Sequence, residues 1–314
     1  MSKKVLQTHN SIHDFFSTQK TIITIGTFDG VHLGHQKILS KLVEEAKALH
    51  YESLVLTFFP HPRMVLGKEN SIKLINTIEE KKQLLEAIGI HHLIIHEFDT
   101  NFANLSAKDF VEKILVGKLN VGKIIIGYDH KFGKGRTADI NDLIEFGKQF
   151  GFEVEQISAE EIGDIAISST KIRKALLEGN IKLANQFLGY TFEFTGKVIE
   201  GKKIGRTIQF PTANISIEES YKLLPKNGVY IITSEIDTKN YHGMMNIGTN
   251  PTLGENQQTI EVHFFDFDQN IYNKILTIKV LDKIREEQKF DSLEALRLQL
   301  KKDQTFSKSY FEKL

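Results

Sequence analysis

The stretch Thr21-Ile-Ile-Thr-Ile-Gly-Thr-Phe-Asp-Gly-Val-His-Leu-Gly-His35 decides the fold of the first half of the chain. Its β-branched run, Thr21 to Gly26, is typical of a buried strand. A helix is predicted directly afterwards, from about Gly34 to His50, so the residues between form a strand-to-helix turn. In open parallel sheets, ligands bind in the loops beyond the carboxyl ends of the strands. We therefore expect a binding site at this turn.

The rest of the first half repeats the alternation of apolar strand and helix. Thr77 and Glu80 form a capping box at the start of one helix, and Ser106 is expected to cap another. Further strands are predicted at Leu54–Phe58, His92–Ile95, Lys123–Gly127 and about Phe152–Gln156. This pattern predicts an α/β unit whose parallel sheet is covered by helices on both faces.

The second half has a different pattern of predicted secondary structure. It contains strand-like runs separated by turn residues, at Thr191–Ile199, Val229–Ile236, Tyr241–Ile247, Thr259–Phe265 and Ile275–Leu281. A helical period is predicted at Thr170–Glu178 and Ile181–Leu188, before these runs, and again at Ser292–Leu300. An antiparallel sheet or small β-barrel with a terminal helix fits this pattern. We place the domain boundary in the turn after Leu188, giving domains 1–188 and 189–314.

Composition narrows the class of protein. The 314 residues include 40 Lys plus Arg and 40 Asp plus Glu, so a broad basic surface for nucleic acid is not expected. The chain has no cysteine, which excludes disulfides, thiolate metal sites and a cysteine nucleophile. Its start lacks the apolar core of a secretory signal, and no apolar run approaches the length of a membrane span. We expect a cytoplasmic protein with no membrane partner.

The turn after the first strand carries a pattern suited to phosphate. Gly26 and Gly30 allow a tight turn, and His32 and His35 share one face at the start of the helix. A helix N-terminus favours anions through its free N–H groups and its dipole. Two imidazoles there suit a triphosphate whose charge shifts as pyrophosphate leaves. Two surface histidines are the plainer alternative, and a metal pair is less favoured because no third ligand is evident.

Other loops of the first half carry compatible groups. Ser168 and Thr170 lie at a predicted helix start with Arg173 one turn in, which suits phosphate but also simple N-capping. Asp129 follows a strand at the carboxyl edge of the sheet. The loop at residues 57–62, Thr-Phe-Phe-Pro-His-Pro, is stiff and aromatic and could stack on a planar ring.

A separate cluster is predicted in the second half. Thr212 and Asn214 lie two residues apart in an extended segment, so both could reach one hard cation such as Mg²⁺. Glu261 alternates with apolar neighbours in a strand and could accept a proton from a hydroxyl nucleophile. Taken alone, such a glutamate is more often a solvated outward residue.

Two other motifs are discounted. The stretch 196–203, Gly-Lys-Val-Ile-Glu-Gly-Lys-Lys, resembles a P-loop but lacks the final hydroxyl residue. The stretch 133–138, Gly-Lys-Gly-Arg-Thr-Ala, matches a dinucleotide fingerprint, but a spacer separates it from its strand. A nicotinamide-dependent dehydrogenase built on it is therefore disfavoured.

Taken in order, the motifs resemble those of the bacterial bifunctional riboflavin kinase/FMN adenylyltransferase family. The segments that carry the resemblance to the adenylyltransferase module are 26–35, 57–62, 126–136 and 167–190, and those that resemble the kinase module are 196–214, 227–230, 246–252 and 261–267. The resemblance implies a Rossmann-like nucleotidylyltransferase domain followed by a β-barrel kinase domain. It also implies two reactions: riboflavin plus ATP gives FMN plus ADP, and FMN plus ATP gives FAD plus pyrophosphate.

The resemblance implies a role for each candidate residue. Contacts with ATP or its phosphates are implied for Gly26, Phe28, Asp29, His32, Gly34, His35, Ser168, Thr170, Arg173, Gly205 and Arg206, with His32, His35 and Arg173 catalytic. Flavin contacts are implied for Phe58, His61, Pro62 and Asp129. In the kinase module Thr212 and Asn214 would hold Mg²⁺, and Glu261 would be the catalytic base.

The chain departs from the family pattern at four places. Gln209 and Asn273 stand where the family often has Gly, His130 replaces a commoner Phe, and Phe59 replaces a commoner acid. None of them is a residue assigned to chemistry. Two rival readings are a nucleotidylyltransferase for another phosphorylated acceptor and a flavin-binding sensor without turnover. We expect small-molecule partners only, and a monomer or weak homo-oligomer.

Overall fold

The computed structural model describes residues 5–67, 72–128, 130–158, 167–201, 204–249 and 258–313. Contacts divide the chain into two units, Met1–Ser168 and Ser169–Leu314. Each unit has its own apolar core. This division groups the helices between Ser169 and Leu188 with the second unit, while the predicted domain boundary at residue 188 stays a prediction.

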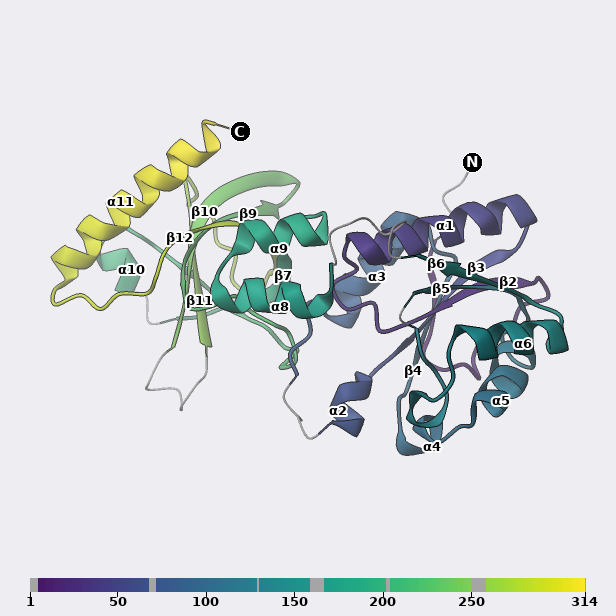
Figure 1. Cartoon of the computed structure of the whole chain (residues 1–314). Coiled ribbons are helices and arrows are strands. Elements are labelled where there is room, and N and C mark those ends of the chain that lie inside the picture. The colour runs from purple at the N-terminus through teal and green to yellow at the C-terminus, as the bar shows by residue number, and fades with distance from the viewer. Residues whose placement is uncertain are drawn as a thin grey trace. The chain divides into compact units, whose positions relative to one another are not determined.

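The first unit is built on a parallel sheet (Figure 1). Its described strands are β1 (Gln7–His9), β2 (Thr21–Ile25), β3 (Glu52–Phe58), β4 (His92–His96), β5 (Val121–Gly127) and β6 (Glu153–Ile157). They lie in the order β1-β4-β3-β2-β5-β6, and all pairs are parallel. The predicted parallel sheet is confirmed, and β1 is an edge strand that the sequence analysis did not identify.

Strand order predicts where a ligand would bind on this sheet. From β2 the chain builds outward through β3 and β4, and then returns to place β5 on the other side of β2. Adjacent parallel strands whose connections leave in opposite directions form a topological switch point, and ligands bind outside the carboxyl ends there. The turn after Ile25 and the segment after Gly127 lie at those two strand ends.

Helices cover both faces of this sheet. The described ones are α1 (Leu33–Leu49), α2 (Pro62–Leu66), α3 (Ile78–Ile88), α4 (Thr100–Ala103), α5 (Ala107–Asp109), the π-helical η1 (Phe110–Val116), the 3₁₀ turn η2 (Lys134–Arg136) and α6 (Ile140–Phe150). Strand residues alternate between the two faces: Ile22 and Val55 pack in one core with α1 and α3, whereas Ile23 and Leu54 pack in another with η1 and α6. Both predicted caps, at Thr77 and Ser106, are present.

The second unit contains a closed antiparallel barrel (Figure 1). Its described strands are β7 (Glu193–Ile199), β8 (Ala213–Ser216), β9 (Gly228–Ile236), β10 (Lys239–Thr249), β11 (Gln258–Phe264) and β12 (Ile275–Arg285). They close in the order β10-β11-β8-β7-β12-β9, because β9 also pairs with β10. The predicted small barrel is confirmed, and the short strand β8 is an addition to it.

The second unit also contains helices before, between and after the barrel strands. They are α8 (Ser169–Glu178), α9 (Ile181–Leu188), the one-turn α10 (Ile204–Thr207) and α11 (Leu293–Phe311). Helix α11 continues well beyond the predicted end at Leu300. No helix in the described parts of the chain combines the length and apolar character needed to cross a bilayer.

A buried ion pair fastens α11 to the barrel. Asp303 is 2% exposed and accepts hydrogen bonds from Arg285 of β12, through Nε at 3.0 Å and Nη2 at 2.8 Å. Gln299 Nε2 donates to the same carboxylate at 2.8 Å. Because Arg285 would be left as a buried charge without it, this carboxylate holds the C-terminal half of α11 in place.

We expect Asp303→Ala to lower the free energy of unfolding of the second unit by about 3 kcal/mol or more. Urea denaturation followed by far-ultraviolet circular dichroism measures the change. Asp266→Asn is the matched control, because Asp266 pairs with Lys308 at 3.3 Å on the surface and Asn tolerates the left-handed conformation found there, so little change is expected. Equal losses in the two variants would contradict the role given to Asp303.

Candidate functional site

The turn between β2 and α1 has an unusual backbone. Phe28, Gly30 and Val31 all lie in the left-handed region, with φ of 45°, 85° and 34°. Glycine adopts such angles freely, but a β-branched residue such as Val31 does so at a cost of about 1–3 kcal/mol. Strained backbone persists where surrounding contacts fix it, and it is concentrated at functional sites.

Hydrogen bonds from two side chains tie this turn to neighbouring segments. Asp29 is 2% exposed, and its Oδ1 accepts hydrogen bonds from the backbone N–H groups of Ile75 (2.9 Å) and Asn76 (3.4 Å). Lys81 of α3 donates from Nζ to the carbonyl oxygen of Thr27 at 2.7 Å. The turn is thereby bound to the segment that leads into α3.

The two predicted histidines lie together at the start of α1. His32 is the N-cap residue, and its Nδ1 accepts a hydrogen bond from the backbone N–H of His35 at 3.4 Å. The two rings stack with their centroids 3.7 Å apart, and the ring of Phe28 meets His35 edge-on at 5.1 Å. The predicted shared face of His32 and His35 is therefore present.

Burial keeps both imidazoles neutral. Desolvation lowers the pKa of His32 to about 4, although a backbone hydrogen bond opposes this. Burial also lowers the pKa of His35 well below its ordinary value, and the nearby charges of His32 and Lys81 lower it further. At neutral pH the pair can donate hydrogen bonds to an anion without carrying a resident positive charge.

One ring nitrogen of His35 makes no hydrogen bond. Among the described residues, its buried Nδ1 has no hydrogen-bond partner. Buried polar atoms are normally satisfied, so an unsatisfied one beside a helix N-terminus indicates a place for a ligand atom. Gly34 is buried in the first turn of the same helix.

The predicted flavin contacts are placed as follows. Phe58 ends β3 and packs against Phe98 and Phe102, with centroids 5.5 and 5.2 Å away. His61 is the N-cap of α2 and accepts a hydrogen bond from the backbone N–H of Arg63, and Pro62 is the first residue of that helix. Asp129 lies outside the described residues. Flavin binding by these residues stays a prediction.

The predicted phosphate-binding segment lies where the two units meet in sequence. Ser168 is the last residue of the first unit, while Thr170 and Arg173 lie in the first turns of α8. Arg173 is partly exposed. Their contact with the triphosphate stays a prediction.

In the barrel, strand register brings the predicted metal ligands and the predicted base together. Asn214 of β8 pairs directly with Glu261 of β11, and Glu261 pairs on its other side with Asn246 of β10. Directly opposed residues project to the same face of a sheet. Thr212 adds a hydroxyl that donates to Glu261 Oε2 at 3.3 Å. Thr212, Asn214 and Glu261 are thus one cluster.

Glycines make room around this cluster. A side chain at Gly201 would collide with the amide of Asn214, and one at Gly205 would collide with the carbonyl oxygen of Phe210. Arg206 lies in α10, and its side chain is outside the described part of the structure. The hydroxyl, amide and carboxylate oxygens of the cluster are hard donors of the kind that Mg²⁺ prefers.

The discounted motifs adopt other structures. Gly196 lies inside β7, whereas the first glycine of a P-loop stands in the loop after a strand. Phe132 and Ala138 form an isolated antiparallel bridge across the 133–138 stretch. That bridged loop does not open a helix directly after a strand, as a dinucleotide site requires.

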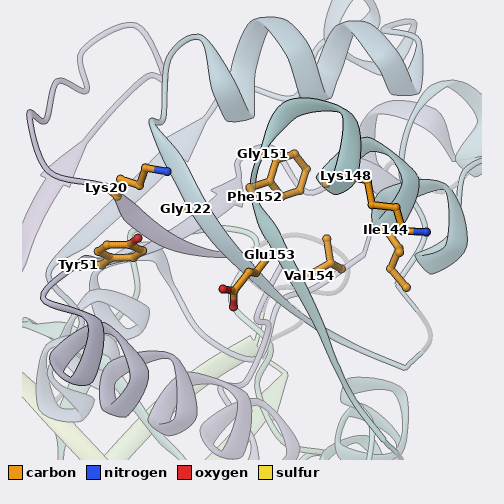
Figure 2. Close-up of a pocket in the computed structure, with 10 residues that line it drawn as sticks. Lys20, Tyr51, Gly122, Ile144, Lys148, Gly151, Phe152, Glu153 and Val154 are labelled. Carbon is orange, nitrogen blue, oxygen red and sulfur yellow. The ribbon is translucent and has the colours of Figure 1, made fainter.

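A pocket of about 450 Å³ lies at the opposite edge of the first sheet (Figure 2). Lys20, Tyr51, Gly122 and Glu153, which line it, precede or begin β2, β3, β5 and β6. The pocket therefore lies at the amino ends of the parallel strands, away from the predicted site at their carboxyl ends.

The comparisons with known proteins match each half of the chain to a different family model. Residues 15–171 match the family model described as FAD synthetase, and residues 188–311 match the one described as riboflavin kinase. The two matches define a class of flavin transferase in which one chain joins an FAD synthetase unit to a riboflavin kinase unit.

Relatives narrow this class to one family. Bifunctional riboflavin kinase/FMN adenylyltransferases from Buchnera aphidicola (strain Sg) and Bacillus subtilis are 40% and 39% identical to the chain, covering 92% and 94% of it and 93% and 94% of their own length. The Escherichia coli K12 enzyme is 34% identical, and the match covers 92% of each. The chain belongs to the bifunctional riboflavin kinase/FMN adenylyltransferase family.

A solved structure shares the whole fold. A crystal structure described as a macrolide-efflux protein from Streptococcus pneumoniae is 31% identical, with a TM-score of 0.88, and the match covers 97% of this chain and 99% of that one. The similarity extends over both units.

Three residues of the site were missed from the sequence. Lys81 lies in a run of four charged residues, which reads as a solvated helix face. Asn246 lies in a motif that carried the family resemblance, but no role was assigned to it. Gly201 lies in the discounted P-loop stretch and in a segment that carried the family resemblance, but no role was assigned to it. Its nearness to Asn214 follows from the pairing of Ile199 with Asn214.

The lowered pKa of His32 makes the first unit sensitive to acid. The folded state holds this imidazole neutral. Its contribution to the free energy of unfolding is therefore fully present above about pH 6.5 and is lost as pH falls toward 4. Between pH 7 and pH 5 we expect wild type to lose about 2 kcal/mol more than His32→Asn, which keeps a capping oxygen. Hydrogen exchange of α1 amides measures this, and equal losses would contradict it.

Proposed function

We propose that this chain phosphorylates riboflavin to FMN and adenylylates FMN to FAD, and that its two units divide the reactions. The first unit performs adenylyl transfer at the turn that leads into α1. The second performs phosphoryl transfer at the cluster on β8 and β11. The observation that carries the proposal is that one chain holds two separate constellations, His32 with His35 and Thr212 with Asn214 and Glu261.

Adenylyl transfer needs positioning more than it needs a base. The phosphate of FMN is already anionic at neutral pH and attacks the α-phosphorus of ATP, so that the bond to pyrophosphate breaks. The N-terminus of α1 and the N–H groups of His32 and His35 bind the phosphates whose negative charge grows. The unsatisfied Nδ1 of His35 supports this role. Ser168, the last residue of the first unit, adds a hydroxyl donor to the same phosphates, and the phosphate contacts of Thr170 and Arg173 stay predictions from the family resemblance.

Phosphoryl transfer to riboflavin has a different requirement. The primary hydroxyl of riboflavin is a weak nucleophile, so a carboxylate that takes its proton assists attack on the γ-phosphorus of ATP. Glu261 is that carboxylate, and it is partly exposed on a strand whose neighbours Ile260 and Val262 are buried. Contacts of Gly205 and Arg206, two residues of α10, with the phosphates of ATP are part of the proposal.

The oxygen donors of the barrel cluster fit a magnesium ion. Bound there, Mg²⁺ supplies charge neutralisation and orientation for the phosphates of ATP. Thr212 and Asn214 would hold it, while the strand pairing of Asn214 with Glu261 keeps the metal ligands beside the base.

The experiments below also distinguish two other functions. A nucleotidylyltransferase for another phosphorylated acceptor would use the first site and only bind substrate in the barrel. A flavin sensor would bind without turnover, but it has no need for a base and metal ligands in addition to the paired histidines. We further propose a cytoplasmic enzyme, monomeric or weakly self-associating, with no nucleic-acid partner.

Glu261→Gln is expected to lower FMN formation about a hundredfold or more, because the proton acceptor is lost. FAD formation from supplied FMN stays within about twofold, since that site is in the other unit. Chromatography of the flavins after incubation with ATP and Mg²⁺ measures both. Glu235→Gln, on an exposed position of β9, is the control.

His32→Asn is expected to do the reverse, lowering FAD formation from FMN about a hundredfold while FMN formation is retained. Asn keeps the N-cap, so the loss reports on the imidazole. His50→Asn, at the other end of α1, is the control, because Asn tolerates the left-handed conformation found there. Loss of both activities in either folded variant would refute the division of labour.

Asn214→Ala is expected to raise the Mg²⁺ concentration for half-maximal FMN formation by about tenfold or more. The Mg²⁺ dependence of FAD formation from FMN stays unchanged. Titration of both rates with Mg²⁺ measures the shift, with Asn240→Ala on the exposed start of β10 as the control. An unaltered titration would remove Asn214 from the metal site.

A further inference from the structure

Lys81 is a buried cation that neither reaction has yet been given. Its side chain belongs to the first full turn of α3 and the residue is 4% exposed. Lysine is almost never this buried without a specific role, and the start of a helix is unfavourable for positive charge. Its neighbour Lys82 is more exposed and pairs with Glu79 at 2.6 Å on the surface. The contrast marks Lys81 as the member of the pair with a particular function.

The contacts of Lys81 point to the turn after β2. Its Nζ donates to the carbonyl oxygen of Thr27 at 2.7 Å, and the hydroxyl of Thr57 donates to the same oxygen at 3.2 Å. In a planar trans peptide, the carbonyl of one residue and the N–H of the next point in opposite directions. Holding the Thr27 carbonyl toward α3 and β3 therefore directs the N–H of Phe28 away from them.

Electrostatics couple the same ammonium to the site. Asp29, which is anchored on the backbone of Ile75 and Asn76, stabilises the charge of Lys81. Burial is the larger effect and lowers the pKa of Lys81 to about 8, so it remains mostly protonated at pH 7. Its charge is also felt at His35. Lys81 is thus within reach of the turn, the acid and the paired histidine.

We propose that Lys81 is a positioning residue for adenylyl transfer: its ammonium fixes the Thr27 carbonyl and thereby holds the left-handed turn in the conformation that receives the triphosphate. The left-handed angles at Phe28, Gly30 and Val31 require such external restraint. The inference rests on the proposed phosphate site at His32 and His35.

The chain offers a clean chemical test, because it has no cysteine. Lys81→Cys would carry the only thiol of the protein. Alkylation in urea with 2-bromoethylamine, followed by refolding, rebuilds a side chain of lysine length that ends in an ammonium. Alkylation with iodoacetamide gives a neutral side chain of similar length. The two products differ mainly in the charge placed at the Thr27 carbonyl.

We expect the ammonium product to form FAD from FMN and ATP at a rate near that of wild type. The neutral product keeps an N–H donor but loses the charge, so kcat/KM for ATP should fall about tenfold or more, as expected when a charge-assisted hydrogen bond becomes a neutral one. Riboflavin kinase activity of the same samples shows that refolding succeeded in the second unit. Circular dichroism and hydrogen exchange of α1 report on the first unit. Lys82→Met is the matched control and should match wild type.

The outcomes separate this inference from the proposed function. If the two alkylated products are equally active, while His32→Asn abolishes FAD formation, the role of Lys81 is overturned and the phosphate site stands. If His32→Asn leaves FAD formation intact, the proposed site itself fails. If only the ammonium product refolds in the first unit, Lys81 is a folding residue and the positioning role is overturned. Lys81→Met within about twofold of wild type would overturn it as well.

Discussion

The tight passage from β2 into α1 is the constraint that organises the first unit. Within a few residues the chain must leave a central strand, reverse through left-handed angles and present a helix N-terminus at the switch point of the sheet. His32 meets two demands at once, because it caps the helix and belongs to the predicted phosphate site. The cost of the turn is offset by contacts from Asp29 and Lys81, so α3 belongs to the site although it carries none of the predicted catalytic groups.

The two units bring residues together through different sheet architectures. A parallel sheet gathers loops at one edge, which suits a reaction governed by charge and position. An antiparallel ladder instead sets residues from distant parts of the chain directly opposite each other, as it does for Asn214 and Glu261. Attack by a hydroxyl needs a base and a metal at a fixed separation, and the ladder provides neighbours of that kind.

Much of the fold could be predicted from the sequence, because long periodic segments and strong helix caps indicate the local secondary structure. The central strands, α1 and the Thr77 capping box were identified in this way, whereas β1 and β8 are too short to show a period. Burial of Lys81 depends on the turn that packs on it, which a run of Glu and Lys cannot reveal. Gln209 and Asn273 looked like unexplained departures from glycine. Both lie at positive φ, 64° and 65°, so the backbone explains the family's preference for glycine there.

The pairing of Asn214 with Glu261 affects how this protein tolerates change. Backbone hydrogen bonds between β8 and β11 set the distance between the two positions, and the identity of the apolar side chains inside the barrel has little influence on it. Core residues such as Ile260 and Val262 can therefore drift among apolar types over evolution while the geometry of the chemistry is inherited unchanged. A one-residue slip of register would separate the pair at once. We therefore expect insertions and deletions to be tolerated in the loops between these strands and not within them.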